Sequence, residues 1–259
     1  VSVRYCYYKK DNVKKPVLVF IHGLGGDCLA WKVETKYFES RGYNTLAVDL
    51  RGHGLSDDPI SLEAYELERM ARDILEIVEE EKIETYILIG HCFGGMVSIY
   101  MASMSPQGLK SMILIDTSYR ATLLGLDMGT WPRFSKVLEK LAYALPVEPP
   151  RLHEDYEPFV GGVDMDIQRF ISDVRSTSIR SYLICCSKLA KYDAEFLFEK
   201  IKIPTLVVCG DEDTIFPKEI SQKLSSRIKK AKYVDIKGTN HIMVLNKPKE
   251  LAEEIEKFI

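Results

Sequence analysis

The chain has 259 residues, of which 46% are hydrophobic and 28% charged, and its 35 basic and 38 acidic side chains leave a formal charge of -3. This composition excludes a disordered or fibrous protein and indicates a soluble globular fold with one large core. No block of basic residues is present, which argues against nucleic acid or an anionic membrane as partner, so we expect a small-molecule partner.

Neither a membrane span nor a secretory signal is expected. No run approaches the roughly 18 apolar residues that a span requires, and residues 1–12 lack the apolar segment of a signal peptide, so a cytoplasmic location is predicted. The six cysteines show no CxxC spacing and are interpreted as free thiols. Histidines are scattered and no HExxH motif occurs, so no metal and no cofactor is predicted.

Short apolar runs bounded by turn residues predict buried strands. An antiparallel edge strand is expected first, at Val3–Tyr8. The other expected strands, in chain order, are Pro16–Ile21, Asn44–Leu50, Thr85–Ile89, Ser111–Ile115, Pro204–Cys209 and Tyr233–Ile236. Helices are predicted between several of them, at Trp31–Ser40, Ser61–Glu81, Phe93–Met104, Lys218–Ile228 and Lys249–Phe258.

This alternation of strands and helices predicts an α/β fold with a mainly parallel sheet covered by helices on both faces. The alternation breaks once, over residues 117–203, where the pattern becomes helical and irregular. A structureless connection of that length is uncommon in compact domains. We therefore expect a helical lid, residues 117–203, over a core made of residues 1–116 and 204–259.

A G-x-C-x-G motif carries the strongest chemical signal. The expected strand at Thr85–Ile89 runs into Gly90-His-Cys92-Phe-Gly94, and a helix follows directly. Glycines two residues before and after the central residue allow a sharp strand-to-helix turn, which lifts that side chain above the sheet. A helix N-terminus favours a thiolate, so Cys92 is predicted to be a nucleophile. The alternative interpretation is a buried structural cysteine.

A second glycine-rich turn follows the first buried strand, in His22-Gly-Leu24-Gly-Gly. Acyl transfer places negative charge on a carbonyl oxygen, and backbone N–H groups of such a turn and of the residue after the nucleophile stabilise that charge. The candidates are Leu24 and Phe93. Phosphate binding is the weaker interpretation, because no GxxxxGK[ST] motif is present.

A thiol nucleophile needs a base, and the base needs an orienting carboxylate. His241 follows the last expected strand, and Asp213 lies in the turn after the strand before it. Asp211 and Asp116 are rival acids, since Asp116 also follows a strand. Asp213 is preferred.

The segments HGLGG, RGHGLSD, GHCFGG, GDEDTIFP and a final NH, in the order nucleophile, acid, histidine, resemble the α/β-hydrolase superfamily across nearly the whole chain. The chain is most similar to lid-bearing carboxylesterases, lactonases and carbon–carbon bond hydrolases. The resemblance implies an α/β-hydrolase fold, with Cys92 as nucleophile, His241 as base and then acid, Asp213 as orienting group and the N–H groups of Leu24 and Phe93 as oxyanion donors. It also implies that His53 and His91 are structural.

Cys92 stands where most relatives carry serine. It is either the natural residue, as in dienelactone hydrolases and polyhydroxyalkanoate synthases, or an engineered Ser→Cys replacement; a third interpretation is that the fold only binds a ligand. Haloalkane dehalogenases and epoxide hydrolases need a carboxylate at this position, so that branch is disfavoured. We expect a carboxylic ester hydrolase, acting on a small ester, lactone or thioester through an acyl-cysteine; acyl transfer is the nearest alternative, and a silent ligand-binding protein the alternative from another class.

The lid is expected to set the size and apolarity of the substrate, because small-molecule pockets are largely hydrophobic. Five aromatic or methionine side chains in the lid are candidates for the pocket wall, and ordinary packing inside the lid is an equally good interpretation of each. They are Tyr119, Met128, Trp131, Tyr143 and Phe159.

Overall fold

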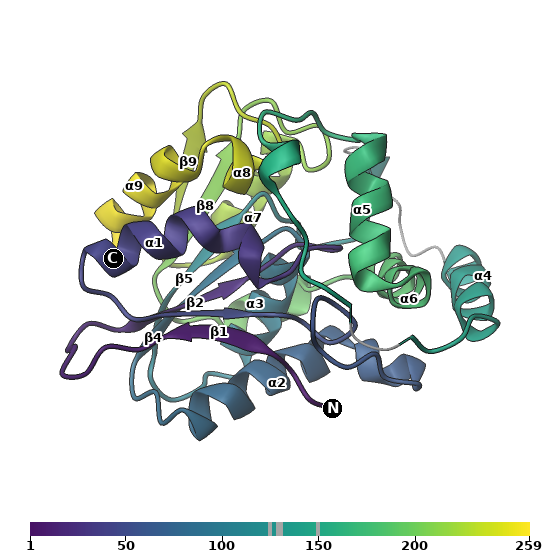
Figure 1. Cartoon of the computed structure of the whole chain (residues 1–259). Helices are drawn as coiled ribbons and strands as arrows, with labels where there is room; N and C mark the ends of the chain where they lie inside the picture. Colours follow the sequence, from purple (N-terminus) through teal and green to yellow (C-terminus); the bar gives the residue numbers. More distant parts are fainter. Residues whose placement is uncertain (124–125, 128–131, 149–150) are drawn as a thin grey trace.

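A single mainly parallel sheet organises the chain. The computed structural model describes residues 1–123, 126–127, 132–148 and 151–259. Within these residues, seven strands form one sheet in the order β1-β3-β2-β4-β5-β8-β9 (Figure 1). They are β1 (Tyr5–Tyr8), β2 (Val17–Ile21), β3 (Thr45–Val48), β4 (Tyr86–His91), β5 (Leu109–Ile115), β8 (Thr205–Gly210) and β9 (Ala231–Ile236).

Within this seven-stranded sheet, only the edge strand β1 runs antiparallel, with Tyr5 opposite Val48 of β3. The other neighbouring strands pair in parallel. Strands β2, β3, β4 and β8 are buried along their whole length, which explains why they read as continuous apolar runs rather than as alternating patterns.

Helices cover both faces of the sheet, and side chains of alternate strand residues enter two separate hydrophobic cores. Helices α1, α8 and α9 pack on the face that carries Phe20 and Ile113, and α2, α3 and α7 pack on the face that carries Val19 and Met112. Their bounds are α1 (Lys32–Ser40), α2 (Leu67–Glu80), α3 (Phe93–Ser103), α7 (Lys218–Arg227), α8 (Met243–Asn246) and α9 (Pro248–Phe258). Two 3-10 helices, η1 (Cys28–Trp31) and η2 (Leu62–Tyr65), precede α1 and α2.

The predicted α/β-hydrolase architecture is confirmed. Each strand and helix expected from the sequence within residues 1–116 and 204–259 is present, with ends displaced by a few residues. Helix α8 was not expected, because its four residues are too few to show helical periodicity.

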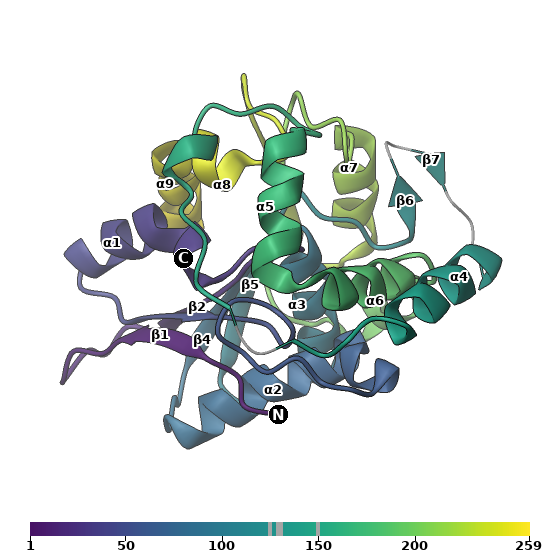
Figure 2. The ribbon, with the colours of Figure 1, turned by 45° about the vertical axis from the view of Figure 1, so that its right-hand side comes forward.

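Residues 117–203, called the insert here, lie between β5 and β8. Their described elements are β6 (Thr122–Leu123), β7 (Leu126–Asp127), α4 (Pro132–Tyr143), η3 (Glu157–Phe159), α5 (Ile167–Thr177), α6 (Ile179–Leu189) and η4 (Glu195–Lys200). Helix α6 packs against both α4 and α5. Figure 2 shows α5 upright beside the sheet, with α6 and α4 following outward. Local capping fixes where α5 begins, since the Asp166 carboxylate accepts the N–H groups of Gln168 and Arg169. Among the described residues, no helix has the length and apolarity needed to cross a membrane.

Candidate active site

The sharp turn between β4 and α3 presents Cys92. Its backbone has φ 51° and ψ -115°, a strained conformation for a residue with a side chain. Two contacts hold this conformation in place. The N–H of Cys92 donates to the carbonyl of Ile115 (2.9 Å) at the end of β5, and the hydroxyl of Thr117 donates to the carbonyl of Cys92 (2.6 Å). Cys92 is half-buried, so a substrate can reach its thiol.

The two glycines of the motif are required by close packing of backbone. A Cβ on Gly90 would lie 2.5 Å from the carbonyl oxygen of Gly94, and a Cβ on Gly94 would overlap the carbonyl oxygens of Ile21 and His22. The start of α3 therefore lies directly against the end of β2. This contact fixes the position of the turn by backbone alone, whichever side chain residue 92 carries.

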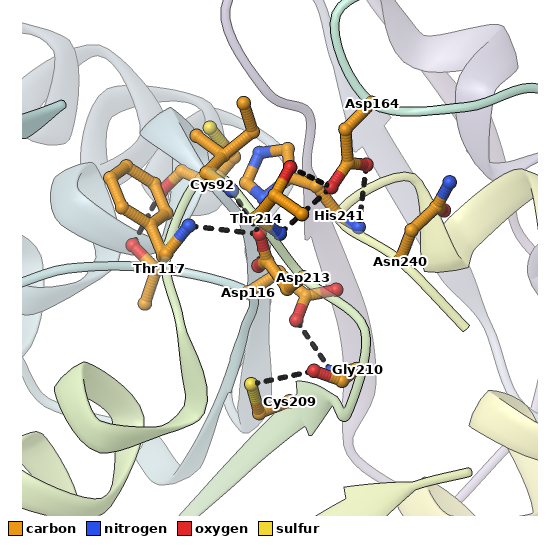
Figure 3. A network of polar contacts seen from close by, with 12 residues as sticks. Cys92, Asp116, Thr117, Asp164, Cys209, Gly210, Asp213, Thr214, Asn240 and His241 are labelled. Atoms are coloured by element: carbon orange, nitrogen blue, oxygen red, sulfur yellow. Dashed lines mark hydrogen bonds and ion pairs between the residues drawn. The ribbon is translucent and has the colours of Figure 1, made fainter. Parts of the chain in front are cut away.

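The loops after β8 and β9 bring an acid and a histidine to Cys92 (Figure 3). Nδ1 of His241 lies 2.9 Å from Oδ2 of Asp213. The other carboxylate oxygen of Asp213 accepts the N–H groups of Ile215 and Phe216, both at 2.8 Å. These bonds fix the carboxylate, and through it the orientation of the imidazole. The ring's Nε2 is thereby left free of Asp213, and Cys92 lies near enough to raise the pKa of the imidazole.

The charges of these three residues support one another. Burial alone would lower the pKa of His241, but its attraction to Cys92 and to Asp213 outweighs burial and raises that pKa well above the usual value. Burial tends to raise the pKa of Asp213, and the charge and hydrogen bond of His241 together with the two backbone N–H groups lower it below its usual value. The arrangement therefore favours protonation of the imidazole beside the Asp213 carboxylate.

The two rival acids have other partners. Asp211 accepts the backbone N–H of Gly238 at 2.7 Å. Asp116 accepts the N–H of Gly210 at 2.8 Å and lies beside Asp213, fully buried. Burial and the neighbouring negative charge of Asp213 raise the pKa of Asp116 well above its usual value. The preferred Asp213 is the acid that contacts His241.

The first glycine-rich turn passes next to the nucleophile. A Cβ on Gly23 would lie 3.3 Å from Cβ of Cys92, so Leu24 follows directly at the site. Phe93 is the first residue of α3, and the first N–H groups of a helix have no acceptor within the helix. The two predicted oxyanion donors thus belong to segments that meet beside Cys92. Their catalytic role stays a prediction.

The two histidines expected to be structural are buried and uncharged. Nε2 of His91 lies 2.8 Å from the carbonyl oxygen of His241, to which it donates. His53 stacks on Phe93 with ring centroids 6.3 Å apart. Burial lowers the pKa of both to about 3. His22 is likewise buried, and it accepts the N–H of Leu50 on Nε2 (3.0 Å) while Nδ1 lies 2.7 Å from the Gly23 carbonyl.

The residues expected to line a pocket have different surroundings. Tyr119 is buried against Phe198, with ring centroids 5.7 Å apart, as in ordinary core packing. Tyr143 is 76% exposed at the C-terminal end of α4, which does not suit a pocket wall. Phe159 packs partly buried against the core that includes α8. Met128 and Trp131 lie outside the described residues.

Sequence reasoning missed two insert residues at the site. The carboxylate of Asp164 accepts the N–H of His241 (2.9 Å) through one oxygen, and the N–H (2.9 Å) and hydroxyl (2.8 Å) of Thr214 through the other (Figure 3). Tyr182 of α6 lies near enough to Cys92 for the two to interact electrostatically. No sequence signal marks either one, because both contacts join segments distant in the chain.

In the described part of the chain, two groups of side chains have atoms of metal-binding type close together. Asp116, Cys209 and Asp213 form the first, and Cys28, Asp49 and His153 the second. In the first, the carboxylate of Asp213 is already bound by His241 and by two backbone N–H groups. It is part of the acid network of the triad region. The second was not expected from sequence spacing and is taken up below.

Comparison with known proteins places this geometry in a family. Residues 16–248 match the family described as alpha/beta hydrolase fold. The chain is 22% identical over 257 residues to 3-oxoadipate enol-lactonase 2 of Acinetobacter baylyi, covering 99% of this chain and 92% of that protein. It is 22% identical over 279 residues to epoxide hydrolase 1 of Caenorhabditis elegans, covering 100% of this chain and 68% of that protein.

Among solved structures, the enol-lactonase from Burkholderia xenovorans superposes with a TM-score of 0.77 at 23% identity, covering 99% of this chain and 95% of that one. At such identity the likeness establishes the fold. The matched family extends over nearly the whole chain and includes the turns that carry Cys92, Asp213 and His241. The chain belongs to the alpha/beta hydrolase fold family.

Proposed function

We propose that this protein is a carboxylic ester hydrolase that works through an acyl-cysteine on Cys92. The observation that carries the proposal is the placement of His241, which hydrogen-bonds Asp213 and lies near enough to Cys92 for the two to interact electrostatically. A nucleophile, a base and an orienting acid in this order are the parts that acyl transfer requires. Lactones and thioesters fall within the same chemistry.

The reaction has two balanced halves. His241 takes the thiol proton, the sulfur bonds to the ester carbonyl carbon, and the negative oxygen is stabilised by the N–H groups of Leu24 and Phe93. The carbon–oxygen bond to the leaving group then breaks, and the imidazolium gives its proton to the departing alkoxide. In the second half His241 takes a proton from water, which attacks the thioester carbon, and the released thiolate recovers the proton.

Two relatives named above are called enol-lactonases, and a lactone is a cyclic ester. A third is called an epoxide hydrolase. Opening an epoxide through an alkyl ester intermediate needs a carboxylate nucleophile, and residue 92 is a cysteine. The nucleophile therefore favours ester over epoxide chemistry in this chain.

We also propose that the insert, residues 117–203, acts as a lid over a core made of residues 1–116 and 204–259. Three contacts support this role. The Ser176 hydroxyl of α5 donates to the carbonyl of Gly25 in the glycine-rich turn (3.0 Å), Asp164 accepts from His241, and Tyr182 lies near Cys92. Tyr182 and Phe159 are the proposed apolar boundary of the acyl site.

The test is a stopped-flow burst experiment with p-nitrophenyl acetate and p-nitrophenyl butyrate. The protein should release about one equivalent of nitrophenol rapidly and then turn over steadily, and Cys92→Ala should reduce turnover by about 10³-fold or more. Cys186→Ser is the matched control: its partly buried thiol lies in α6, and burial raises its pKa to about 12, so activity should be unchanged. The ratio of acetate to butyrate rates measures how closely the lid bounds the acyl group.

Other outcomes distinguish the alternatives. If Cys92→Ser is far faster than the cysteine protein, the acyl-cysteine part of the proposal is wrong and the site is that of a serine esterase. Diversion of most product to a new ester by added alcohol would identify an acyltransferase. No burst from either the cysteine or the serine protein would overturn the enzyme proposal in favour of a ligand-binding protein.

A further inference from the structure

Four side chains with soft or borderline metal-binding atoms meet away from the triad, and we call them the edge cluster: Cys6, Cys28, Asp49 and His153. They come from β1, from η1, from the end of β3 and from the insert, so no sequence motif connects them. The two sulfur atoms are 3.0 Å apart. Nε2 of His153 lies 3.6 Å from the sulfur of Cys28 and 2.8 Å from Oδ2 of Asp49.

The separations among Cys28, Asp49 and His153 are close to those of a tetrahedral zinc site, and Cys6 joins these three through its contact with Cys28. Zinc bonds of about 2.0 to 2.3 Å place neighbouring ligand atoms roughly 3.3 to 3.8 Å apart. The ligand atoms of Cys28, Asp49 and His153 all lie within 4.8 Å of one another, so small movements outward would seat an ion between them. Two sulfurs, one imidazole and one carboxylate also select zinc, whereas calcium and magnesium prefer oxygen ligands alone.

The groups around the edge cluster already orient its ligands. Asp49 is fully buried, and its two carboxylate oxygens accept the N–H groups of Cys28 (2.8 Å) and Leu55 (3.0 Å). These bonds and the contact with His153 keep the pKa of Asp49 below its usual value in spite of burial. Outer contacts of this kind fix ligand geometry in metal sites.

The insert side of the edge cluster is held independently of the ligands. Asp27 accepts the N–H of Glu154 on its carboxylate (2.6 Å), and its own N–H donates to the hydroxyl of Tyr156 (2.9 Å). His153 therefore stays in place before any ion binds. Cys6 is exposed, so an ion from solvent can reach its sulfur.

We propose that Cys6, Cys28, Asp49 and His153 bind one zinc ion in a closed tetrahedral site. The ion joins β1, η1, the end of β3 and the insert, so its role is to hold the insert against the core. Binding releases the two thiol protons to water, and a proton of His153 where the imidazole is charged. The site is separate from the proposed ester chemistry and does not depend on it.

A disulfide between Cys6 and Cys28 is the competing explanation of their proximity. Its formation would need an external oxidant such as a glutathione disulfide, and it would give no reason for His153 and Asp49 to converge on the same sulfur. The proposal therefore treats oxidation of this pair as a result that would contradict it.

The experiment uses the whole chain, reduced and stripped of metal with a chelator, and titrates it with zinc against a chromophoric chelator. One equivalent should bind tightly, and the free energy of unfolding should rise with free zinc concentration. Cobalt titrated in place of zinc should give a thiolate charge-transfer band and tetrahedral visible bands. The partly exposed positions Cys6→Ser and His153→Gln should each weaken zinc binding by at least about 100-fold without unfolding the chain.

Two control variants locate the ion. Cys186→Ser should keep full zinc affinity, and so should Cys92→Ala, which tests whether the triad thiol captures the ion instead. Loss of binding in Cys92→Ala with retention in Cys6→Ser would place zinc at the triad and overturn the proposal. A reduced chain that binds no zinc would also overturn the proposal. So would an air-exposed chain that forms a disulfide between Cys6 and Cys28, detected as a mass loss of two hydrogens.

Discussion

Two neighbouring histidines of the site have opposite electrostatics. His91 and His241 are both buried, and their ring centroids are 5.1 Å apart. The pKa of His91 is lowered to about 3 by burial and by repulsion from His241. The pKa of His241 is raised well above its usual value, because attraction to Cys92 and Asp213 outweighs the same burial.

The difference shows that burial does not decide the charge of a histidine in this site; the anionic partners decide it. His91 meets only a neutral carbonyl oxygen, on the backbone of His241, and serves as a fixed support for that loop. His241 lies beside Asp213 and Cys92, and in the proposed reaction it carries a proton between substrate and water. Under that proposal His91 positions the loop and His241 transfers protons.

The largest expected effect comes from removing the acid that creates this difference. In Asp213→Asn, the amide donates to Nδ1 and holds the imidazole in the wrong tautomer, so kcat should fall by about 10³- to 10⁴-fold. The pKa of His241, followed by NMR titration, should move down toward the range of His91. Asp211→Asn is the matched control, and its kcat should change less than about threefold. Equal losses in the two variants would contradict the assignment of Asp213.

The pH dependence of unfolding should have opposite signs for the two histidines. His91 has a folded pKa of about 3, below its unfolded value of 6.5. Its contribution to stability is therefore present at neutral pH and is lost as the pH falls from the unfolded to the folded pKa, by at most about 1.4 kcal/mol per pH unit. His241 has a raised folded pKa, so its contribution is complete below the ordinary histidine pKa and lost as pH rises through the folded value.

Chemical denaturation of His91→Gln and His241→Gln from pH 4 to 9 measures both signs. His91→Gln should flatten the acid side of the stability profile, and His241→Gln should flatten the alkaline side. Profiles that change on the same side in both variants would show that the two rings are not electrostatically distinct.

The smallest effect is expected at the second buried carboxyl. The pKa of Asp116 is raised well above its usual value and one of its carboxylate oxygens accepts the Gly210 N–H, so Asp116→Asn keeps this acceptor in an uncharged side chain. The free energy of unfolding should change by less than about 1 kcal/mol and kcat by less than about threefold. A large loss in either, measured by denaturation and by ester turnover, would mean that Asp116 is ionised and shares the role of Asp213.

Much of the core was predictable because its signals are local. The strands are continuous apolar runs, and the glycines around Cys92 mark a turn that only such residues allow, so periodicity and spacing located both. Asp213 and His241 were found because each follows a strand, and parallel strands bring their carboxyl ends to the same edge.

The missed features depend on contacts between distant segments. Asp164 reaches His241 from 77 residues away, and His153 reaches Asp49 from 104 residues away. Nothing in the residues around them distinguishes these two side chains from solvated surface groups. The pocket-wall predictions were weak for the same reason, since the apolar side chains of the insert pack inside it as readily as they face a substrate.

The backbone of the turn at Cys92 has a consequence for how this chemistry can evolve. The close contacts of Gly90 and Gly94 with neighbouring carbonyl groups set the position of the turn. The side chain of residue 92 takes no part in these contacts. A mutation that exchanges sulfur for oxygen there would change the nucleophile and leave the scaffold intact. Mutations of the two glycines would disrupt the turn whichever side chain residue 92 carries. Residue 92 can therefore change during evolution much more freely than Gly90 and Gly94.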